Sequence, residues 1–143
     1  MPLPDLPVPT EPSALDLLQD RDGDGRPEIL VGMDGADLVE VRSSRDGSVL
    51  LAVPAPISGV GFGASLAALG DLDGDGFEDF AVGVFYQSVV HVFSGALGSA
   101  LRRFADSRPF FGVSLTSLGD VNGDGFEDLA IGSLPDTYNG VSG

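Results

Sequence analysis

Short apolar runs separated by turn-forming residues recur along the chain from residue 14 to residue 134. Runs of this length that are rich in Val, Ile, Leu and Phe and end at Gly, Asp or Pro are typical of β-strands. The pattern predicts strands at residues 14–18, 28–33, 37–41, 48–53, 64–69, 79–85, 89–93, 100–104, 113–118 and 128–134. No apolar run in the sequence approaches the length of a membrane-spanning helix.

The predicted strands form a repeat of about 50 residues. Asp20 and Asp71 are 51 residues apart, Asp71 and Asp120 are 49 apart, and each opens the same acidic stretch. Short strands at such a period indicate a propeller or a solenoid rather than a compact sandwich. The first two units supply four strands each, whereas the third supplies two before a turn-rich end at residues 135–143.

A nine-residue acidic stretch joins the first and second predicted strands of every unit, at residues 20–28, 71–79 and 120–128. Positions 1, 3, 5 and 9 carry oxygen side chains, and positions 4 and 6 are glycine. Oxygen ligands at alternate positions of a loop that glycine allows to curl suit Ca²⁺, which takes 6–8 oxygens. We therefore predict about three Ca²⁺ ions per chain, bound by Asp20, Asp22, Asp24 and Glu28, by Asp71, Asp73, Asp75 and Asp79, and by Asp120, Asn122, Asp124 and Asp128.

The alternative interpretation of these loops is an EF-hand, which opens in the same way. An EF-hand requires a bidentate Glu at position 12 and a helix on each side. Position 12 is Val31, Val82 and Ile131 in the three copies, and a short apolar run ending at glycine follows each loop. The sequence therefore favours a Ca²⁺ loop between two strands, closed by the carboxylate at position 9.

A second signature precedes two of the loops. Phe62-Gly63 and Phe111-Gly112 lie nine residues before Asp71 and Asp120, and Ser-Leu follows two residues after each glycine. Together with the acidic loop and the Ala-Val-Gly or Ala-Ile-Gly that follows it, this pattern resembles the FG-GAP repeat over about residues 13–134. That repeat builds the β-propeller of integrin α subunits and of many bacterial surface proteins.

The resemblance implies that each repeat is a four-stranded antiparallel blade with a Ca²⁺ loop between its first and second strands. It also implies that the backbone carbonyl at loop position 7 is a ligand, which assigns Arg26, Phe77 and Phe126 to the three sites. Asn122 at position 3 and Glu28 at position 9 depart from the family pattern of Asp. A complete ring has about seven blades, whereas this chain supplies about two and a half.

The predicted fold is therefore an all-β, incomplete β-propeller. We expect a Pro-rich linker at residues 1–12, a first blade at about 13–57, a second at about 58–108, and half of a third at about 109–143. Prolines at five of the first twelve positions remove the backbone donors that a sheet requires.

Composition narrows the classes of function. The net charge is −15, which argues against nucleic acid and anionic membranes as partners. The absence of Cys excludes disulfides, thiol catalysis and a Cys-based zinc site. The single histidine, His91, is expected to be an edge or packing residue of a strand. Residues 59–64 fit a dinucleotide-binding fingerprint, but a strand follows them where a helix is needed. We expect no enzymatic activity.

These inferences indicate a calcium-binding structural or adhesive module that Ca²⁺ stabilises blade by blade. We expect it to be extracellular, where weak Ca²⁺ modules are filled, although residues 1–12 lack the basic start and apolar core of a secretory leader. Its expected partners are other protein chains or further copies of itself, bound through blade flanks. The alternatives are a carbohydrate-binding propeller and a non-catalytic piece of a larger secreted enzyme.

Overall fold

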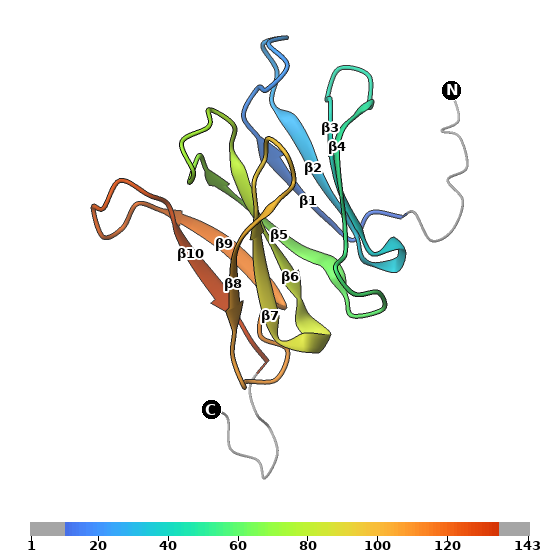
Figure 1. Ribbon diagram of the computed structural model, residues 1–143, viewed down its shortest axis with the longest axis vertical. Coiled ribbons are helices and arrows are strands. Elements are labelled where there is room, and N and C mark those ends of the chain that lie inside the picture. The colour runs from blue at the N-terminus through green and yellow to red at the C-terminus, as the bar shows by residue number, and fades with distance from the viewer. Residues whose placement is uncertain (1–10, 135–143) are drawn as a thin grey trace.

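The computed structural model describes residues 11–134, which form three antiparallel sheets and two short 3-10 helices (Figure 1). The first sheet has the order β1 (Ala14–Leu18), β2 (Glu28–Met33), β3 (Leu38–Arg42) and β4 (Val49–Pro54). The second has the order β5 (Phe62–Gly70), β6 (Asp79–Val84), β7 (Val89–Phe93) and β8 (Ala100–Ala105). The third pairs β9 (Ser114–Gly119) with β10 (Asp128–Gly132). Most of the predicted linker, and the residues after 134, lie outside the described range.

The predicted strands are confirmed to within about two residues. The sequence did not indicate the helices η1 (Asp34–Ala36) and η2 (Phe85–Gln87), which connect the second strand of each complete sheet to the third. Each ends at a non-glycine residue in the left-handed region, Asp37 with φ 52° and Ser88 with φ 54°. The reversal of the backbone at Asp37 explains why β3 starts one residue later than the apolar pattern predicts.

The three sheets lie side by side, and the first strand of each lies next to the first strand of its neighbour. β5 contacts β1 and β2 on one side and β9 on the other. The acidic loops project along the upper and left margin of Figure 1, away from η1 and η2. This is the arrangement of consecutive blades in an incomplete propeller, in which successive sheets pack face to face around a common centre.

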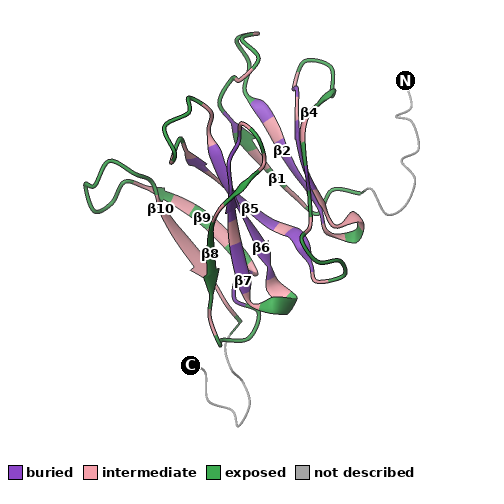
Figure 2. Cartoon of the chain, in the orientation of Figure 1, coloured by how far each residue is buried: buried purple, intermediate pink, exposed green. Residues whose placement is uncertain are grey.

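Apolar side chains from facing sheets form two clusters, one at each junction. At the first junction, Phe62 and Phe80 are fully buried and pack against Phe93, with ring centroids 5.8 and 6.0 Å apart. At the second junction, Phe111 is buried with aliphatic residues of β5, β6 and β7. Figure 2 shows buried residues concentrated in the second sheet, which has a neighbour on both faces. Phe62 and Phe111 therefore pack at the junctions between blades.

In the first two units, the glycine that ends the apolar run after the loop allows close approach between sheets. A Cβ atom on Gly32 would lie 2.0 Å from the carbonyl oxygen of Gly63, in the Phe-Gly segment of the next unit. The equivalent atom on Gly83 would lie 2.2 Å from the carbonyl oxygen of Gly112 and 2.0 Å from Ser65 Oγ. All three distances are shorter than a Cβ atom tolerates. The glycine after the loop of one unit and the Phe-Gly segment of the next unit therefore form the two sides of one contact between neighbouring blades.

Candidate metal centre

The loop geometry is repeated closely in the three units, beginning with the carboxylate at position 1. Asp20 accepts hydrogen bonds from the N–H groups of Gly23 and Gly25, both at 2.8 Å. Asp71 and Asp120 accept the equivalent bonds at 2.7–2.8 Å. All six loop glycines have φ between 77° and 89°, a region that other residues rarely adopt. The glycines at positions 4 and 6 thus let the loop curl around the first aspartate.

Positions 3 and 5 fix the remainder of each loop through local side-chain bonds to the backbone. In the second loop, Asp73 Oδ1 accepts from the N–H of Asp75 at 3.2 Å, and Asp75 Oδ1 accepts from the N–H of Phe77 at 2.9 Å. The same two bonds occur in the other loops, with the Asn122 amide oxygen as the acceptor at position 3 of the third. Asn122 therefore preserves the loop's hydrogen bonding but contributes no charge.

The carboxylate at position 9 lies at the start of the following strand and closes the loop. Asp79 Oδ2 accepts from the N–H groups of Leu72 at 2.6 Å and Asp73 at 3.3 Å, and Glu28 Oε1 accepts from Arg21 at 3.2 Å. Glu28 and Asp79 are completely buried, whereas Asp128 is partly exposed. A buried carboxylate needs partners for both oxygens or a cation beside it.

Carboxylates gather most tightly in the first loop. Ligand oxygens of Asp20, Asp22, Asp24 and Glu28 all lie within 4.8 Å of one another. Asp24 Oδ2 and Glu28 Oε2 are buried and have no hydrogen-bond partner. Two buried carboxylate oxygens without partners, within a group of four carboxylates, are the donor set that a hard cation requires.

The second loop brings together three carboxylates, Asp71, Asp73 and Asp79, within the same distance. Asp75 is not part of this group, and its Oδ2 accepts a bond from Ser94 Oγ at 3.3 Å instead. Among residues 11–134, the third loop forms no such group. The structure therefore assembles the predicted side chains completely in the first loop, in part in the second, and least in the third.

The local environment lowers the pKa of some loop carboxylates and raises the pKa of others. Donation by the N–H of Gly25 lowers the pKa of Asp20, and donation by Gly76 and Gly125 lowers the pKa of Asp71 and Asp120 in the same way. Removal from water raises the pKa of Asp73 and Asp79, and repulsion by nearby carboxylates adds to the increase. A cation beside these groups would reverse that repulsion and favour their ionised form.

Arg21, at position 2 of the first loop, connects that loop to the second. Its Nη1 donates to the carbonyl oxygen of Gly95, and its guanidinium lies 5.0 Å from the centroid of the Phe77 ring. The N–H of Gly95 in turn donates to Asp79 Oδ1 at 2.9 Å. Nothing in the sequence indicated this bridge, because its partners are more than 50 residues away and one of them is a backbone atom.

We expect Arg21→Ala to destabilise the junction between the first two sheets. The change removes a hydrogen bond and a cation–π contact, together about 1–2 kcal/mol, so the Tm falls by several degrees. Arg26→Ala is the matched control, because Arg26 lies in the same loop, carries the same charge and is exposed. Equal melting temperatures for the two variants in thermal denaturation would contradict the bridge.

The remaining sequence candidates do not form sites. Residues 59 and 60 are bends, and β5 begins at Phe62, so a strand rather than a helix follows and the resemblance to a dinucleotide-binding loop is superficial. His91 is half-buried in β7 beside Phe93, and burial together with the positive charge of Arg103 lowers its pKa. Ser94 and Gly95, in the turn between β7 and β8, complete the second loop through their hydrogen bonds to Asp75 and Asp79.

Comparison with known families agrees with the repeated geometry. Residues 20–82 match the FG-GAP-like repeat, and residues 111–142 match the FG-GAP repeat. The chain belongs to the FG-GAP repeat family. FG-GAP repeats are found in integrin-type extracellular propellers, commonly bind calcium, and are generally structural, non-catalytic modules. A search of curated proteins returns no significant match. No helix within residues 11–134 is long and apolar enough to cross a bilayer.

Proposed function

We propose that this FG-GAP chain is a calcium-binding structural module, in which Ca²⁺ holds the turn between the first and second strands of each blade. The proposal rests on two buried carboxylate oxygens, Asp24 Oδ2 and Glu28 Oε2, which have no hydrogen-bond partner. Both belong to the group of four carboxylates in the first loop. Removing charge from water without a partner is costly, so an ion at this position stabilises the folded chain.

The proposed ligands are the side chains at positions 1, 3, 5 and 9 and the position-7 carbonyls of Arg26, Phe77 and Phe126. The first loop supports the proposal most strongly. In the second loop, Asp75 needs only to exchange its Ser94 bond for the ion. In the third loop, Asn122 and the partly exposed Asp128 give a weaker site, since fewer charges and a less buried closing ligand reduce Ca²⁺ affinity.

Calcium titration by calorimetry tests this function. We expect close to three Ca²⁺ per chain, with dissociation constants on the order of 10⁻⁴–10⁻³ M, as in extracellular modules. Mg²⁺ should bind poorly because it demands a tighter octahedral shell. Asp20→Asn, Asp71→Asn and Asp120→Asn should each remove one site. An absence of binding heat, with no calcium in the purified protein by elemental analysis, would reject the proposal.

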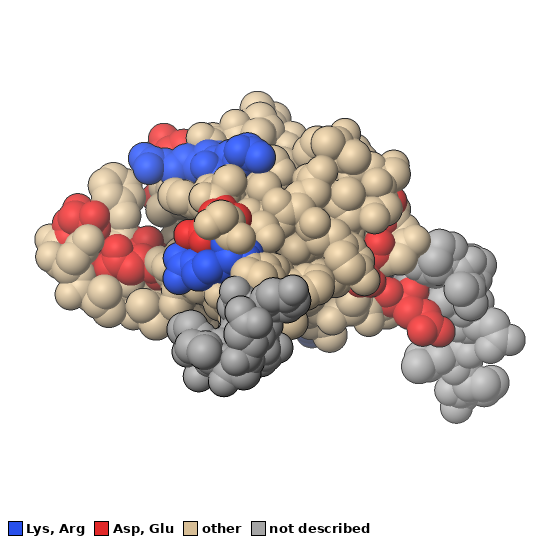
Figure 3. Space-filling view, turned by 90° about the horizontal axis from the view of Figure 1, so that it is seen from below, with Lys and Arg blue, Asp and Glu red and all other residues tan. Residues whose placement is uncertain are grey.

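The module's proposed role is extracellular and adhesive, through contacts with other protein chains or further copies of itself. FG-GAP repeats are typical of extracellular domains, and millimolar Ca²⁺ outside cells would fill sites of the expected affinity. Figure 3 supports protein contact, because charged side chains on the face seen there gather at a few places among a largely uncharged surface. Light scattering after size exclusion in millimolar Ca²⁺ tests self-association.

Carbohydrate binding is a second candidate, favoured by an aromatic group at the end of the second sheet. Phe85, Tyr86 and Phe110 lie with ring centroids 4.3–6.2 Å apart, and Tyr86 is 67% exposed. Phe110 has φ 53°, a strained conformation for a bulky residue. Exposed rings offer a face on which a sugar can stack. Binding to a glycan array that is lost in Tyr86→Ala would support carbohydrate binding in addition to the structural role.

The remaining alternative is that the module is a non-catalytic piece of a larger secreted enzyme. Activity assays of a longer gene product would test it.

A further inference from the structure

The third acidic loop repeats the hydrogen bonds of the second, but it has an amide in place of a carboxylate at position 3. The N–H of Asp75 donates to Asp73 Oδ1 at 3.2 Å, and the N–H of Asp124 donates to Asn122 Oδ1 at 3.1 Å. In both loops the N–H groups at positions 4 and 6 donate to the aspartate at position 1, at 2.7–2.8 Å. The third loop therefore has the backbone and the hydrogen bonding for a carboxylate at position 3.

A carboxylate at position 3 is also what the third loop lacks as a group of ligands. Asp73 belongs to the group of three carboxylates in the second loop. Asp120 and Asp128 stand at positions 1 and 9 of the third loop, and among residues 11–134 they form no such group. Conversion of the Asn122 amide to a carboxylate would give the third loop the ligand types of the second.

The residue that follows Asn122 makes this conversion chemically accessible. Gly123 has no side chain to obstruct its backbone nitrogen, which can attack Asn122 Cγ and close a cyclic succinimide. The attacking nitrogen loses its proton, and the side-chain nitrogen takes one up and leaves as ammonia. Water then breaks the bond between Cγ and the Gly123 nitrogen, which leaves aspartate at position 122. The net reaction consumes one water, releases one ammonia and needs no oxidant or reductant.

The contacts of the third loop favour the attack. A Cβ atom on Gly123 would meet nothing within 4 Å, so the approach to its nitrogen is open. The N–H of Asp124 already donates to Asn122 Oδ1, the atom on which negative charge develops when the nitrogen attacks. Asp120 Oδ1 accepts the Gly123 N–H at 2.7 Å and is the first acceptor for the proton that this nitrogen loses.

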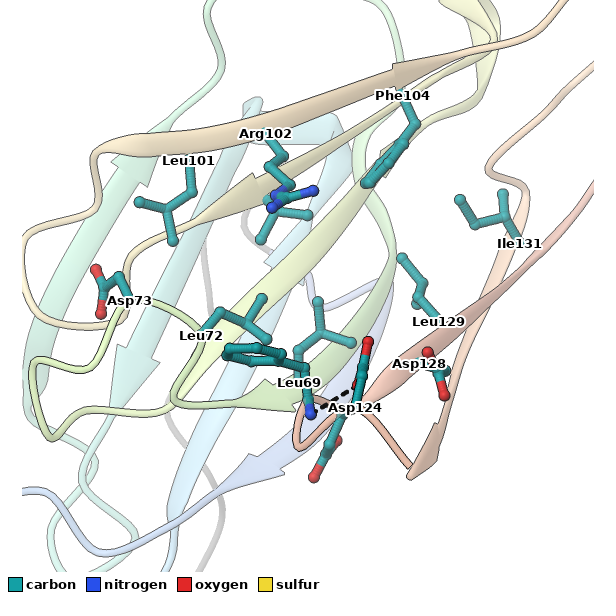
Figure 4. Close-up of a pocket in the computed structure, with 13 residues that line it drawn as sticks. Leu69, Leu72, Asp73, Leu101, Arg102, Phe104, Asp124, Asp128, Leu129 and Ile131 are labelled. Carbon is teal, nitrogen blue, oxygen red and sulfur yellow. Dashed lines mark hydrogen bonds between the residues drawn. The ribbon is translucent and has the colours of Figure 1, made fainter. Parts of the chain in front are cut away.

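Water has access to the same segment. Residues 121–127 are exposed, and Figure 4 shows Asp124 and Asp128 at the wall of a cleft of about 690 Å³ between β8 and β10. The first and second loops have Asp22 and Asp73 at position 3. An ionised carboxylate resists attack by a nitrogen and has no ammonia to lose, so the third loop alone among the three carries this chemistry.

We propose that Asn122 is a self-modification site, which deamidates to aspartate while the third loop holds no calcium and thereby strengthens that loop's calcium site. A larger number of charged ligands raises Ca²⁺ affinity. The calcium coupling rests on the proposed function, because an ion bound to Asn122 Oδ1 restrains the side-chain movement that ring closure requires. A loop deprived of calcium is then converted irreversibly to one that binds calcium more tightly.

The test ages the full chain at mildly alkaline pH, with chelator or with saturating Ca²⁺. Peptide mapping by mass spectrometry measures conversion at Asn122 separately from Asn139, the other asparagine of the chain. It also separates aspartate from isoaspartate, which forms if water breaks the other ring bond. Asn122→Gln is the matched control, because it keeps the amide but must close a larger and slower-forming ring. A synthetic peptide of residues 118–126 gives the rate without the folded loop.

We expect Asn122 of the chelated chain to convert at least as fast as the peptide, because the Asp120 and Asp124 contacts are already formed. Ca²⁺ should slow the conversion several-fold, and Asn122→Gln should stay unconverted. Hydroxylamine, which cleaves a chain at a succinimide, should cut after residue 122 in the chelated chain only. Slower conversion than in the peptide, or isoaspartate as the sole product, would overturn the proposal.

Calcium titration separates this inference from the proposed function. Asn122→Asp and the aged chain with aspartate at position 122 should bind Ca²⁺ at the third loop several-fold more tightly than the fresh chain. Equal affinities would overturn the strengthened site. Conversion at Asn122 in a chain that binds no Ca²⁺ would reject the proposed function, and with it the calcium coupling, and sustain the modification site. Normal Ca²⁺ binding by a chain whose Asn122 stays intact in chelator would reject the modification site alone.

Discussion

Adding 10 mM Ca²⁺ to the chelated protein is expected to raise its Tm by roughly 15 °C or more. A ligand that binds only the folded state stabilises it by RT ln(1 + [L]/Kd), which is about 1.4–2.7 kcal/mol per site for a Kd of 10⁻³–10⁻⁴ M. Three sites give about 4–8 kcal/mol, and a domain of this size gains about 4 °C per kcal/mol. Thermal denaturation followed by circular dichroism measures the shift.

The size of this effect follows from the crowding of the loops. The carboxylates of the first loop lie within 4.8 Å of one another, and repulsion in the second raises the pKa of Asp73 and Asp79 beyond the increase that burial causes. The control is the same concentration of Mg²⁺, which should raise the Tm by a few degrees at most. A triple variant with Asn in place of Asp20, Asp71 and Asp120 should lose most of the calcium response. An equal response to both ions would show that screening, rather than site binding, stabilises the chain.

The strands and loops were predictable because their determinants are local. Apolar runs between turn residues located every described strand, and alternating oxygen side chains with two glycines located the loops. By residue type the sequence favours the second loop, which has Asp at all four positions, over the first, which ends in Glu28. The structure reverses this order, since it gathers four carboxylates in the first loop and three in the second. Glu28, a departure from the family's Asp, belongs to the only group of four carboxylates among residues 11–134, whereas Asp79 of the second loop belongs to a group of three. Asp75 has the expected residue type, but its Oδ2 bonds with Ser94 instead.

Contacts between blades were beyond prediction because they join residues that are distant in sequence. The Arg21 bridge ends on the carbonyl oxygen of Gly95, an atom that every residue type possesses. Within residues 11–134 the third sheet has two strands, and a cleft lies between β8 and β10. Nothing in the sequence of β8 indicates that Phe104 lines this cleft. The glycines after the loops are visible as a motif in the sequence. The reason for glycine at Gly32 and Gly83 is not, because it is the close approach of a backbone carbonyl oxygen of the next unit.

The second large expected effect is that of Gly32→Ala, which should lower the free energy of unfolding by about 3 kcal/mol or more. The new Cβ would lie 2.0 Å from the carbonyl oxygen of Gly63, and a backbone atom cannot move aside as a flexible side chain does. The first two sheets would have to separate, which weakens the cluster around Phe62 and Phe80. Overpacking of this kind costs about 1–3 kcal/mol and occasionally more, a large share of the usual 5–15 kcal/mol of total stability.

The matched control for Gly32→Ala is Gly47→Ala, in the turn between β3 and β4. Gly47 has φ 77° and open space around its Cβ position, so that substitution carries only the backbone cost of about 1–2 kcal/mol. In saturating Ca²⁺, Gly32→Ala should lower the Tm by about 12 °C or more and Gly47→Ala by about 4–8 °C. Calcium affinity at the first loop should be unchanged in both variants, because neither glycine contacts a carboxylate there. If Gly32→Ala melts no lower than Gly47→Ala, the sheets do not meet through the backbone of Gly63, and the close contact between blades described above is wrong.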